Sequence, residues 1–297
     1  MLQCRLCKRQ FEIAGSIPRF VALQNYAHSF GFQWKIHSNT QYDSYTGTRI
    51  SEERFFGETK WPKRLDGQTI LEVGCGSGRF TEQAASTGAM VVSMDYSHSV
   101  ESAYAHNGHK DNVLIVQADM YQMPFKENVF DKVFCFGVLQ HTPNVQNAFR
   151  ALCRHLKCGG SLVIDVYPKY GDPRDWLITK YWVRPLTKRV SPDRLYRWCK
   201  GYVHFMWPVA RVINKIPYFG RRLNLRLLIA DYRGVYPLGE ELLKEWAVLD
   251  TFDMLSPMYD SPQRIEAVKE WFRQAGMTNV EVNYGYNGIE ARGIKAG

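Results

Sequence analysis

The stretch Thr69-Ile-Leu-Glu-Val-Gly-Cys-Gly-Ser-Gly-Arg-Phe80 decides the fold of this chain. Its apolar first half, with Ile70, Leu71 and Val73, is typical of a strand buried on both faces. The alternating glycines that follow leave the backbone open to a ligand, and the next residues resume as a helix whose first N–H groups have no partner. The stretch therefore predicts a strand, a tight turn and a helix, with a ligand at the turn.

The glycine spacing narrows the class of ligand. The dinucleotide fingerprint G-x-G-x-x-G would need its third glycine at position 79, which is Arg79, so a nicotinamide dinucleotide fits badly. The pattern that remains is E-x-G-x-G-x-G starting at Glu72, and a second predicted strand, 90–94, ends at Asp95. With these residues the chain resembles the class I S-adenosylmethionine-dependent methyltransferases.

Two further stretches fall in register with that family. A third predicted strand, 113–118, is followed by Asp119-Met120, and a fourth, 130–137, ends at Phe136-Gly137. The resemblance implies S-adenosyl-L-methionine as cofactor, S-adenosyl-L-homocysteine as product, and contacts from Glu72, Gly74, Cys75, Gly76, Gly78, Asp95, Tyr96, Asp119, Met120, Phe136 and Gly137. The alternative is that Asp95 and Asp119 only cap the loops after buried strands.

Strands and helices alternate from residue 68 to 166, which predicts a parallel sheet with helices on both faces. A last helix over 263–274 and two strands, 278–284 and 288–295, follow. We expect an α/β, Rossmann-like, doubly wound seven-strand sheet with an antiparallel last strand and a helical lid insertion. The predicted parts are a segment 1–60 that includes a cofactor cover, a core of 61–168 with 262–297, and an insertion 169–261.

Composition indicates a protein with reduced cysteines and no membrane-spanning helix. The chain has 297 residues, 45% of them apolar, and its seven cysteines are an odd number without a disulfide-like spacing. The longest apolar run, 202–210, is interrupted by His204 and Pro208 and is far below the ~20 residues that span a bilayer. We expect a cytoplasmic protein, with a peripheral position at the inner membrane face as an option.

The N-terminus contains Cys4-x-x-Cys7, which resembles half of a small zinc-ribbon-like module found before some methyltransferase domains. Tetrahedral zinc needs four nitrogen or sulfur ligands, and the other cysteine pair of that module is absent. The expectation is a truncated remnant without metal.

The next segment, Tyr26 to Trp34, is aromatic and polar without a clear period. One interpretation is that it closes over the cofactor, as similar segments do in the resembled family. The other is that its rings pack on the outer face of the sheet.

The insertion carries the positive charge of the chain. Residues 169–237 contain 15 Lys and Arg against 4 Asp and Glu, while the whole chain has a net charge of +9. Helically spaced apolar residues, interrupted near Pro208, run from Leu195 to Ile216. They fit an anionic membrane surface, a lid packed on the sheet, or nucleic acid, the last disfavoured because no Asn-Pro-Pro-Tyr or Asp-Pro-Pro-Tyr stretch occurs.

Methyl transfer to a hydroxyl needs a base near the mouth of the site. His141 follows the fourth predicted strand and has a suitable pKa range, although it could instead anchor the turn before the next helix. Asp253 and Tyr259 are second candidates that could equally cap loops.

The sequence thus predicts an S-adenosylmethionine-dependent methyltransferase (EC 2.1.1.-) acting on a small-molecule or lipid-linked acceptor, such as a sugar hydroxyl. The alternatives are a cofactor-binding regulatory or scaffold protein without turnover and an RNA-directed methyltransferase.

Overall fold

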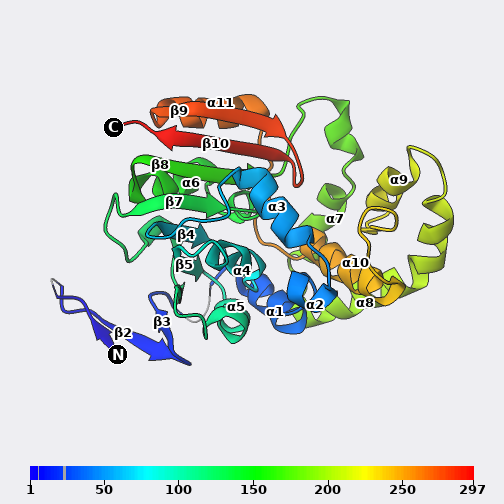
Figure 1. Cartoon of the computed structure of the whole chain (residues 1–297). Coiled ribbons are helices and arrows are strands. Elements are labelled where there is room, and N and C mark those ends of the chain that lie inside the picture. Colours follow the sequence, from blue (N-terminus) through cyan, green and yellow to red (C-terminus); the bar gives the residue numbers. More distant parts are fainter. Residues whose placement is uncertain (6, 23–24) are drawn as a thin grey trace.

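A central β-sheet organises the computed structural model, which describes residues 1–5, 7–22 and 25–297 (Figure 1). The sheet has the strand order β1-β2-β3-β6-β5-β4-β7-β8-β10-β9. Its principal strands are β4 (Thr69–Val73), β5 (Met90–Asp95), β6 (Val113–Gln117), β7 (Phe130–Cys135), β8 (Leu156–Val166), β9 (Met277–Tyr284) and β10 (Ile289–Lys295). β4 to β8 pair in parallel, whereas β10 is antiparallel to both β8 and β9. The predicted Rossmann-like sheet with its antiparallel last strand is confirmed.

Two hydrophobic layers cover the faces of this sheet. The side chains of Ile70 and Leu71 in β4 are both 0% exposed, yet they belong to different layers because adjacent strand residues point to opposite faces. Helices α6 (Val145–His155) and α11 (Ile265–Gln274) contribute to one layer, and α3 (Ile50–Thr59) and α4 (Arg79–Ala85) to the other. Helix α5 (Val100–Asn107) completes the set of crossover helices. The run of apolar residues in β4 reflects burial on both sides.

The first twenty residues extend the sheet. They form β1 (Leu2–Gln3), β2 (Gln10–Ala14) and β3 (Ile17–Arg19), and β3 pairs in parallel with β6 through Arg19 and Gln117. The Arg19 Nη1 also donates a hydrogen bond to the Gln117 Oε1 at 2.7 Å. Within the described ranges, no group of three or more His, Cys, Asp or Glu could hold a metal ion. The zinc-ribbon remnant stays a prediction.

The insertion forms a group of helices at one end of the molecule, on the opposite side from the N-terminal strands (Figure 1). It comprises the 3₁₀ turn η3 (Pro173–Leu177) and helices α7 (Lys180–Thr187), α8 (Pro192–Ile213), α9 (Gly220–Arg226) and α10 (Glu240–Leu255). No helix in the described part of the chain is long and apolar enough to cross a membrane.

The predicted interruption near Pro208 is wrong, because helix α8 continues through this proline. Proline inside a helix costs about 3 kcal/mol because it removes one hydrogen bond and crowds the preceding turn. The side chains of Val203 and Trp207 before the proline, and of Ala210 after it, pack in one cluster with Leu243 and Ala247 of α10. This burial offsets the local cost.

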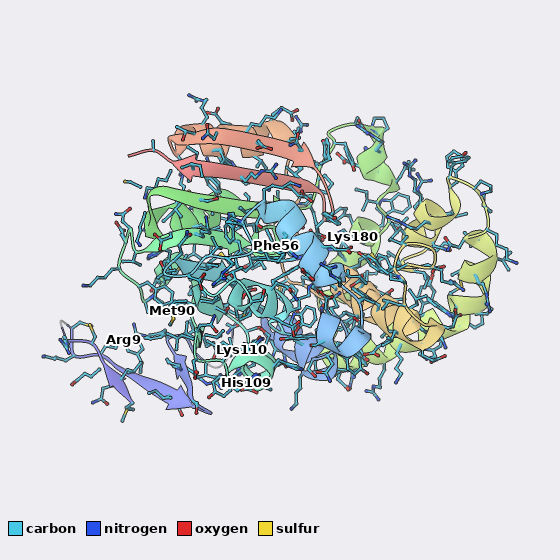
Figure 2. All side chains as sticks on the ribbon, in the orientation of Figure 1. Arg9, Phe56, Met90, His109, Lys110 and Lys180 are labelled. Carbon is cyan, nitrogen blue, oxygen red and sulfur yellow. The ribbon has the colours of Figure 1, made fainter. Side chains whose placement is uncertain are left out.

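Buried ion pairs join the first helix of the insertion to its last residues, next to the core. The Lys180 Nζ lies 2.7 Å from the Asp260 Oδ2, and the Arg184 Nη1 lies 3.8 Å from the same oxygen. The Lys180 ammonium also stands 4.4 Å from the ring centre of Tyr167, which follows β8. Figure 2 shows Lys180 between the sheet and the outer helices. These contacts fix the insertion beside the carboxyl ends of the parallel strands.

Candidate functional site

The glycine loop after β4 adopts a backbone that other residues rarely take. Gly74 has φ +83° and Gly76 has φ +54°. A Cβ added at Gly74 would lie 2.3 Å from the Val138 Cγ2, and one at Gly76 would lie 3.0 Å from the Trp34 Nε1. The N–H groups of Gly74 and Cys75 both donate to the Met94 carbonyl, which holds the loop against β5. Glycine is therefore required here for both conformation and space.

Asp95, at the end of β5, lies beside this loop. Its Oδ2 accepts a hydrogen bond from the Gly76 N–H at 3.0 Å. Its Oδ1 accepts bonds from both the N–H and the hydroxyl of Ser97 at 2.8 Å. The sheet order thus brings together the two elements that the sequence predicted for the cofactor, because β4 and β5 are neighbours.

A cavity of about 940 Å³ opens over the loop, close to the upper end of the ~300–1,000 Å³ usual for ligand sites. The predicted cofactor residues that line it are Gly74, Cys75, Gly76, Asp95, Tyr96, Met120, Phe136 and Gly137. Gly76 lines the cavity and has no Cβ. The lining therefore fits a ligand that lies against the backbone.

Three predicted cofactor residues do not line this cavity. The Glu72 carboxylate lies behind the loop and accepts hydrogen bonds from the hydroxyls of Thr81 and Ser93, and burial raises its pKa to about 7. Gly78 precedes α4, where Asn107 and Tyr42 pack against it. The Asp119 side chain accepts the Tyr121 N–H and caps the short helix η1 (Met120–Gln122). The structure gives these residues positions that support the loops around the cavity.

Helix α1 (His28–Ile36) covers the glycine loop. Tyr26, Phe30 and Trp34 all line the cavity, and the Trp34 ring lies directly over Gly76. The Ser102 hydroxyl donates to the Trp34 carbonyl at 2.8 Å and fixes the helix on α5. This placement supports the hypothesis that the aromatic N-terminal segment closes over the cofactor.

His141 lines the same cavity, and a hydrogen bond from its ring fixes which nitrogen carries the proton. Its Nδ1 lies 3.0 Å from the Tyr259 carbonyl oxygen. A carbonyl only accepts, so Nδ1 carries the proton and Nε2 presents a lone pair. Burial lowers the pKa of His141, which keeps the imidazole neutral near pH 7. The rings of Phe30 and Tyr167 flank it with centroid distances of 5.2 and 5.5 Å.

The two other catalytic candidates have different positions. Asp253 on α10 lines the cavity and accepts from the Gln33 Nε2 and the Tyr167 hydroxyl, each at 3.4 Å. The Tyr259 side chain does not line the cavity; its ring is 37% exposed and packs on Tyr26. Tyr259 contributes through its backbone carbonyl, which positions His141.

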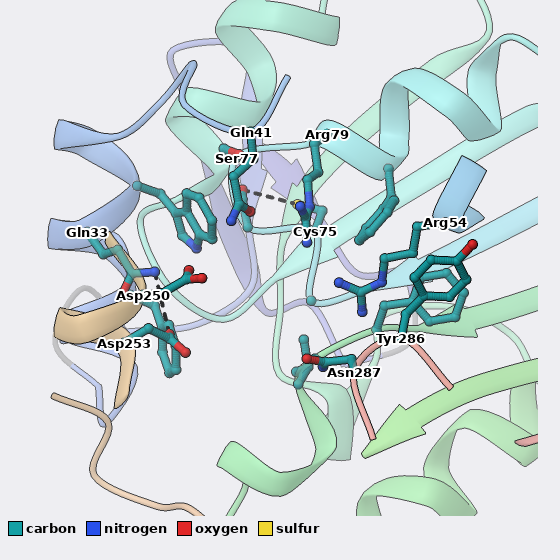
Figure 3. Close-up of a pocket in the computed structure, with 18 of the residues that line it drawn as sticks. Gln33, Gln41, Arg54, Cys75, Ser77, Arg79, Asp250, Asp253, Tyr286 and Asn287 are labelled. Atoms are coloured by element: carbon teal, nitrogen blue, oxygen red, sulfur yellow. Dashed lines mark hydrogen bonds between the residues drawn. The ribbon is translucent and has the colours of Figure 1, made fainter. Parts of the chain in front are cut away.

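Several cavity residues had no role in the sequence analysis. Gln33 is 1% exposed, and its buried Oε1 has no hydrogen-bond partner among the residues that the structure describes. Burial raises the pKa of Asp250 to about 7, and the Tyr232 hydroxyl donates to it at 2.5 Å. Asp250 and Asp253 are three residues apart on α10, a spacing that places both on one face of the helix. From this spacing the sequence could have indicated that α10 lines the site. Figure 3 shows both aspartates across the cavity from Arg54 and Asn287.

Arg54 of α3 forms ion pairs that connect residues on the opposite wall of the cavity. Its guanidinium bonds the carboxylates of Glu58 and Asp165, and both carboxylates are 0% exposed. Asp165 in β8 also accepts a hydrogen bond from the N–H of Gly137, which lies two residues after the end of β7. This buried network of ion pairs and a hydrogen bond fixes the end of the strand where the family resemblance predicts the cofactor.

Comparison with known proteins identifies the fold family. Residues 71–164 match the family described as methyltransferase domain, a span that includes the glycine loop and Asp95. The chain contains a class I methyltransferase domain. The methyltransferase domain implies S-adenosyl-L-methionine as methyl donor, and the glycine backbone that lines the cavity fits that group.

Relatives of the methyltransferase domain differ in their activities. The sterol 24-C-methyltransferase of Pneumocystis carinii is 34% identical over 100 residues, which cover 32% of this chain and 26% of that protein. The ubiquinone biosynthesis O-methyltransferase of Leptothrix cholodnii is 25% identical over 157 residues, covering 46% and 64%. The chain therefore spans about a quarter to two thirds of these relatives.

Among the solved structures that align over most of the chain is the following one. It comes from a Methanococcus maripaludis protein provisionally described as an S-adenosyl-L-methionine-dependent methyltransferase, with 17% identity, 93% and 97% coverage and a TM-score of 0.49.

Replacing Gly76 by alanine is expected to weaken S-adenosyl-L-homocysteine binding at least about tenfold, a loss of about 1.4 kcal/mol. The new Cβ would fill the floor beneath Trp34. Gly67→Ala is the matched control, because Gly67 has φ +76° with nothing within 4 Å and lies outside the cavity lining. Both variants carry the ~1–2 kcal/mol strain of a left-handed backbone. Titration calorimetry showing equal affinities for the two variants would place the cofactor elsewhere.

Proposed function

We propose that this protein transfers a methyl group from S-adenosyl-L-methionine to a hydroxyl oxygen of a small-molecule or lipid-linked acceptor. The observation that carries the proposal is that His141, with Nδ1 bonded to the Tyr259 carbonyl, lines the same cavity as the glycine loop. When bound, the cofactor supplies an electrophilic methyl group on its sulfonium.

The residues of the chain have separate tasks in this proposal. Gly74, Gly76 and Asp95 hold the cofactor, and Trp34 covers it and excludes water. The lone pair on the His141 Nε2 accepts the acceptor hydroxyl proton as the new oxygen–carbon bond forms. Gln33 and Asp253, on the wall beside it, offer hydrogen-bond groups that orient the acceptor.

The part of the cavity that the insertion lines supports an acceptor with apolar surface. Leu225, Val235, Pro237 and Trp246 line it, together with the rings of Tyr232 and Tyr236. The sterol and ubiquinone enzymes among the relatives are named for apolar small molecules. Our proposal also includes a cytoplasmic location, with residues 169–237 resting on an anionic membrane surface.

The direct test separates an enzyme from a binding protein without turnover. Purified protein is incubated with S-adenosyl-L-methionine and either the lipid extract or the aqueous extract of host cells, and S-adenosyl-L-homocysteine is measured. Product above the no-extract control is expected, and less product with the Gly76→Ala variant at a limiting cofactor concentration. Tight cofactor binding with no product from either extract would identify a regulatory or scaffold protein instead.

A further inference from the structure

Helix α8 has two apolar faces, and only one is packed. Its buried face carries Leu195, Cys199, Val203, Trp207 and Ala210, none more than 6% exposed. A second stripe consists of Trp198, Tyr202, Phe205, Val209 and Val212, which are 68%, 38%, 77%, 44% and 66% exposed. Alternating spacings of four and three residues place this stripe along one side of the helix. The exposed stripe, defined by these five residues, is a surface rather than part of the core.

The chain beyond α8 enlarges the apolar surface. Ile216, Tyr218 and Phe219 are 47%, 93% and 65% exposed and connect the end of α8 to α9. Contiguous exposed apolar surface of this kind marks a contact with another phase or partner.

Cations border the exposed stripe. Arg197 and Arg211 are fourteen residues apart, which places both along one side of the stripe. The only carboxylate between residues 176 and 230 is Asp193, which pairs with Arg197 at 2.8 Å. Arg194, Lys200, Arg211 and Lys215 are exposed, and no ion pair is formed by them in the described part of the chain. A second copy of this chain would bring like charges together, whereas an anionic surface would neutralise them.

Aromatic rings beside cations are the composition of helices that lie in the lipid headgroup region. Trp and Tyr settle at the boundary between hydrocarbon and water, and each cation near an anionic leaflet contributes about 1 kcal/mol. The exposed stripe combines a Trp, a Tyr and a Phe with such a border. The occupant that fits best is therefore an anionic lipid surface.

Helix α9 links this surface to the cavity. Arg221 and Leu225 line the cavity, while Leu223, on the same short helix, is 37% exposed and follows the exposed Phe219. One helix thus forms part of the cavity wall and part of the surface beside the stripe.

We infer that the exposed stripe of α8 docks on an anionic bilayer and that the acceptor enters past α9 directly from the lipid. The acceptor class is then a membrane-resident amphiphile with an apolar body and a reactive hydroxyl at the headgroup level. This inference rests on the proposed function for its substrate, but the docking itself is independent of turnover.

The test is flotation of the full chain with phosphatidylcholine vesicles that either contain or lack phosphatidylglycerol. Binding to the anionic vesicles at low salt is expected. It should weaken in 1 M salt, where the screening length falls from about 10 Å to about 3 Å. The double variant Trp198→Ser/Phe205→Ser should reduce the vesicle partition coefficient at least about tenfold. Burial of each aromatic ring in the lipid contributes about 1.5–3 kcal/mol to the free energy of binding, and the variant loses this contribution.

Met90→Ser is the matched control, since Met90 is 52% exposed and lies on β5, on the far side of the molecule from the insertion (Figure 2). All variants should retain S-adenosyl-L-homocysteine affinity, which shows that they fold. No binding to anionic vesicles by protein that binds S-adenosyl-L-homocysteine would overturn the inference. So would a dimer in sedimentation that the double variant abolishes, because the stripe would then belong to a second copy. Vesicle binding without methyl transfer to any lipid extract would instead remove the proposed function and leave the docking intact.

Discussion

Replacing His141 by asparagine is expected to lower kcat by about 10²–10⁴-fold, the usual contribution of a general base. The variant keeps a polar atom near the position of Nδ1 but has no group at the position of Nε2, so proton removal from the acceptor is lost. Binding of S-adenosyl-L-homocysteine should change by less than about twofold, since the structure gives His141 no hydrogen bond to the glycine loop.

The control for this variant is His155→Asn. His155 is 6% exposed and its Nδ1 lies 3.0 Å from the Lys126 carbonyl oxygen, whereas His141 is 5% exposed with the same kind of bond. His155 does not line the cavity, so its variant should show a similar loss of stability with unchanged kcat. Equal turnover in the two variants would make His141 an anchor for the turn.

The pH profile gives a second check on His141. Burial lowers its pKa below the ordinary value of 6.5, and the neutral form is the active base. The rate should therefore be flat above pH 6.5 and fall only as the pH drops through the lowered pKa. A rate that still rises between pH 7 and 8 would point to a base with a higher pKa.

Replacing Arg54 by methionine is expected to reduce the free energy of unfolding by about 3–5 kcal/mol, because it leaves buried carboxylates without their partner. Asp165 has 0% side-chain exposure and receives the Arg54 guanidinium and the Gly137 N–H. Burial, with the negative charge of Asp165 beside it, raises the pKa of Glu58, so one arginine serves two buried carboxyl groups.

Arg49→Met is the matched control for Arg54→Met. Arg49 pairs with Glu52 at 2.8 Å just before α3, but its side chain is 65% exposed. Exposed pairs contribute little to stability because water screens them, so this variant should leave the free energy of unfolding nearly unchanged. Urea unfolding of both proteins, followed by circular dichroism, measures the difference. Similar losses in the two variants would mean that the Arg54 network is solvated.

The sheet could be predicted from the sequence because its signals are local. Ile70, Leu71 and Val73 indicate a doubly buried strand, and the glycines at 74 and 76 follow at once. Asp95 could be placed beside them because consecutive parallel strands end at one edge of a sheet. The N-terminal strands were missed, since Arg19 and Gln117, which join β3 to β6, are far apart in the chain.

The site was only partly predictable for the same reason. His141 has a turn-like sequence context, and its direction depends on the carbonyl of Tyr259, which lies on a different segment. Gln33 and Asp253, from α1 and α10, meet only after the insertion has folded over the core. The exposed stripe on α8 could not be separated from its buried face by spacing alone, because both have helical periodicity.

By itself, the sequence determined the parallel sheet, the glycine loop and the acid beside it, because strand burial and tight turns depend on neighbouring residues. The tertiary structure alone decided that Trp34 covers Gly76, that the Tyr259 carbonyl orients His141, and that Phe205 points away from the core. These depend on which elements pack together, and packing is a property of residues distant in the chain.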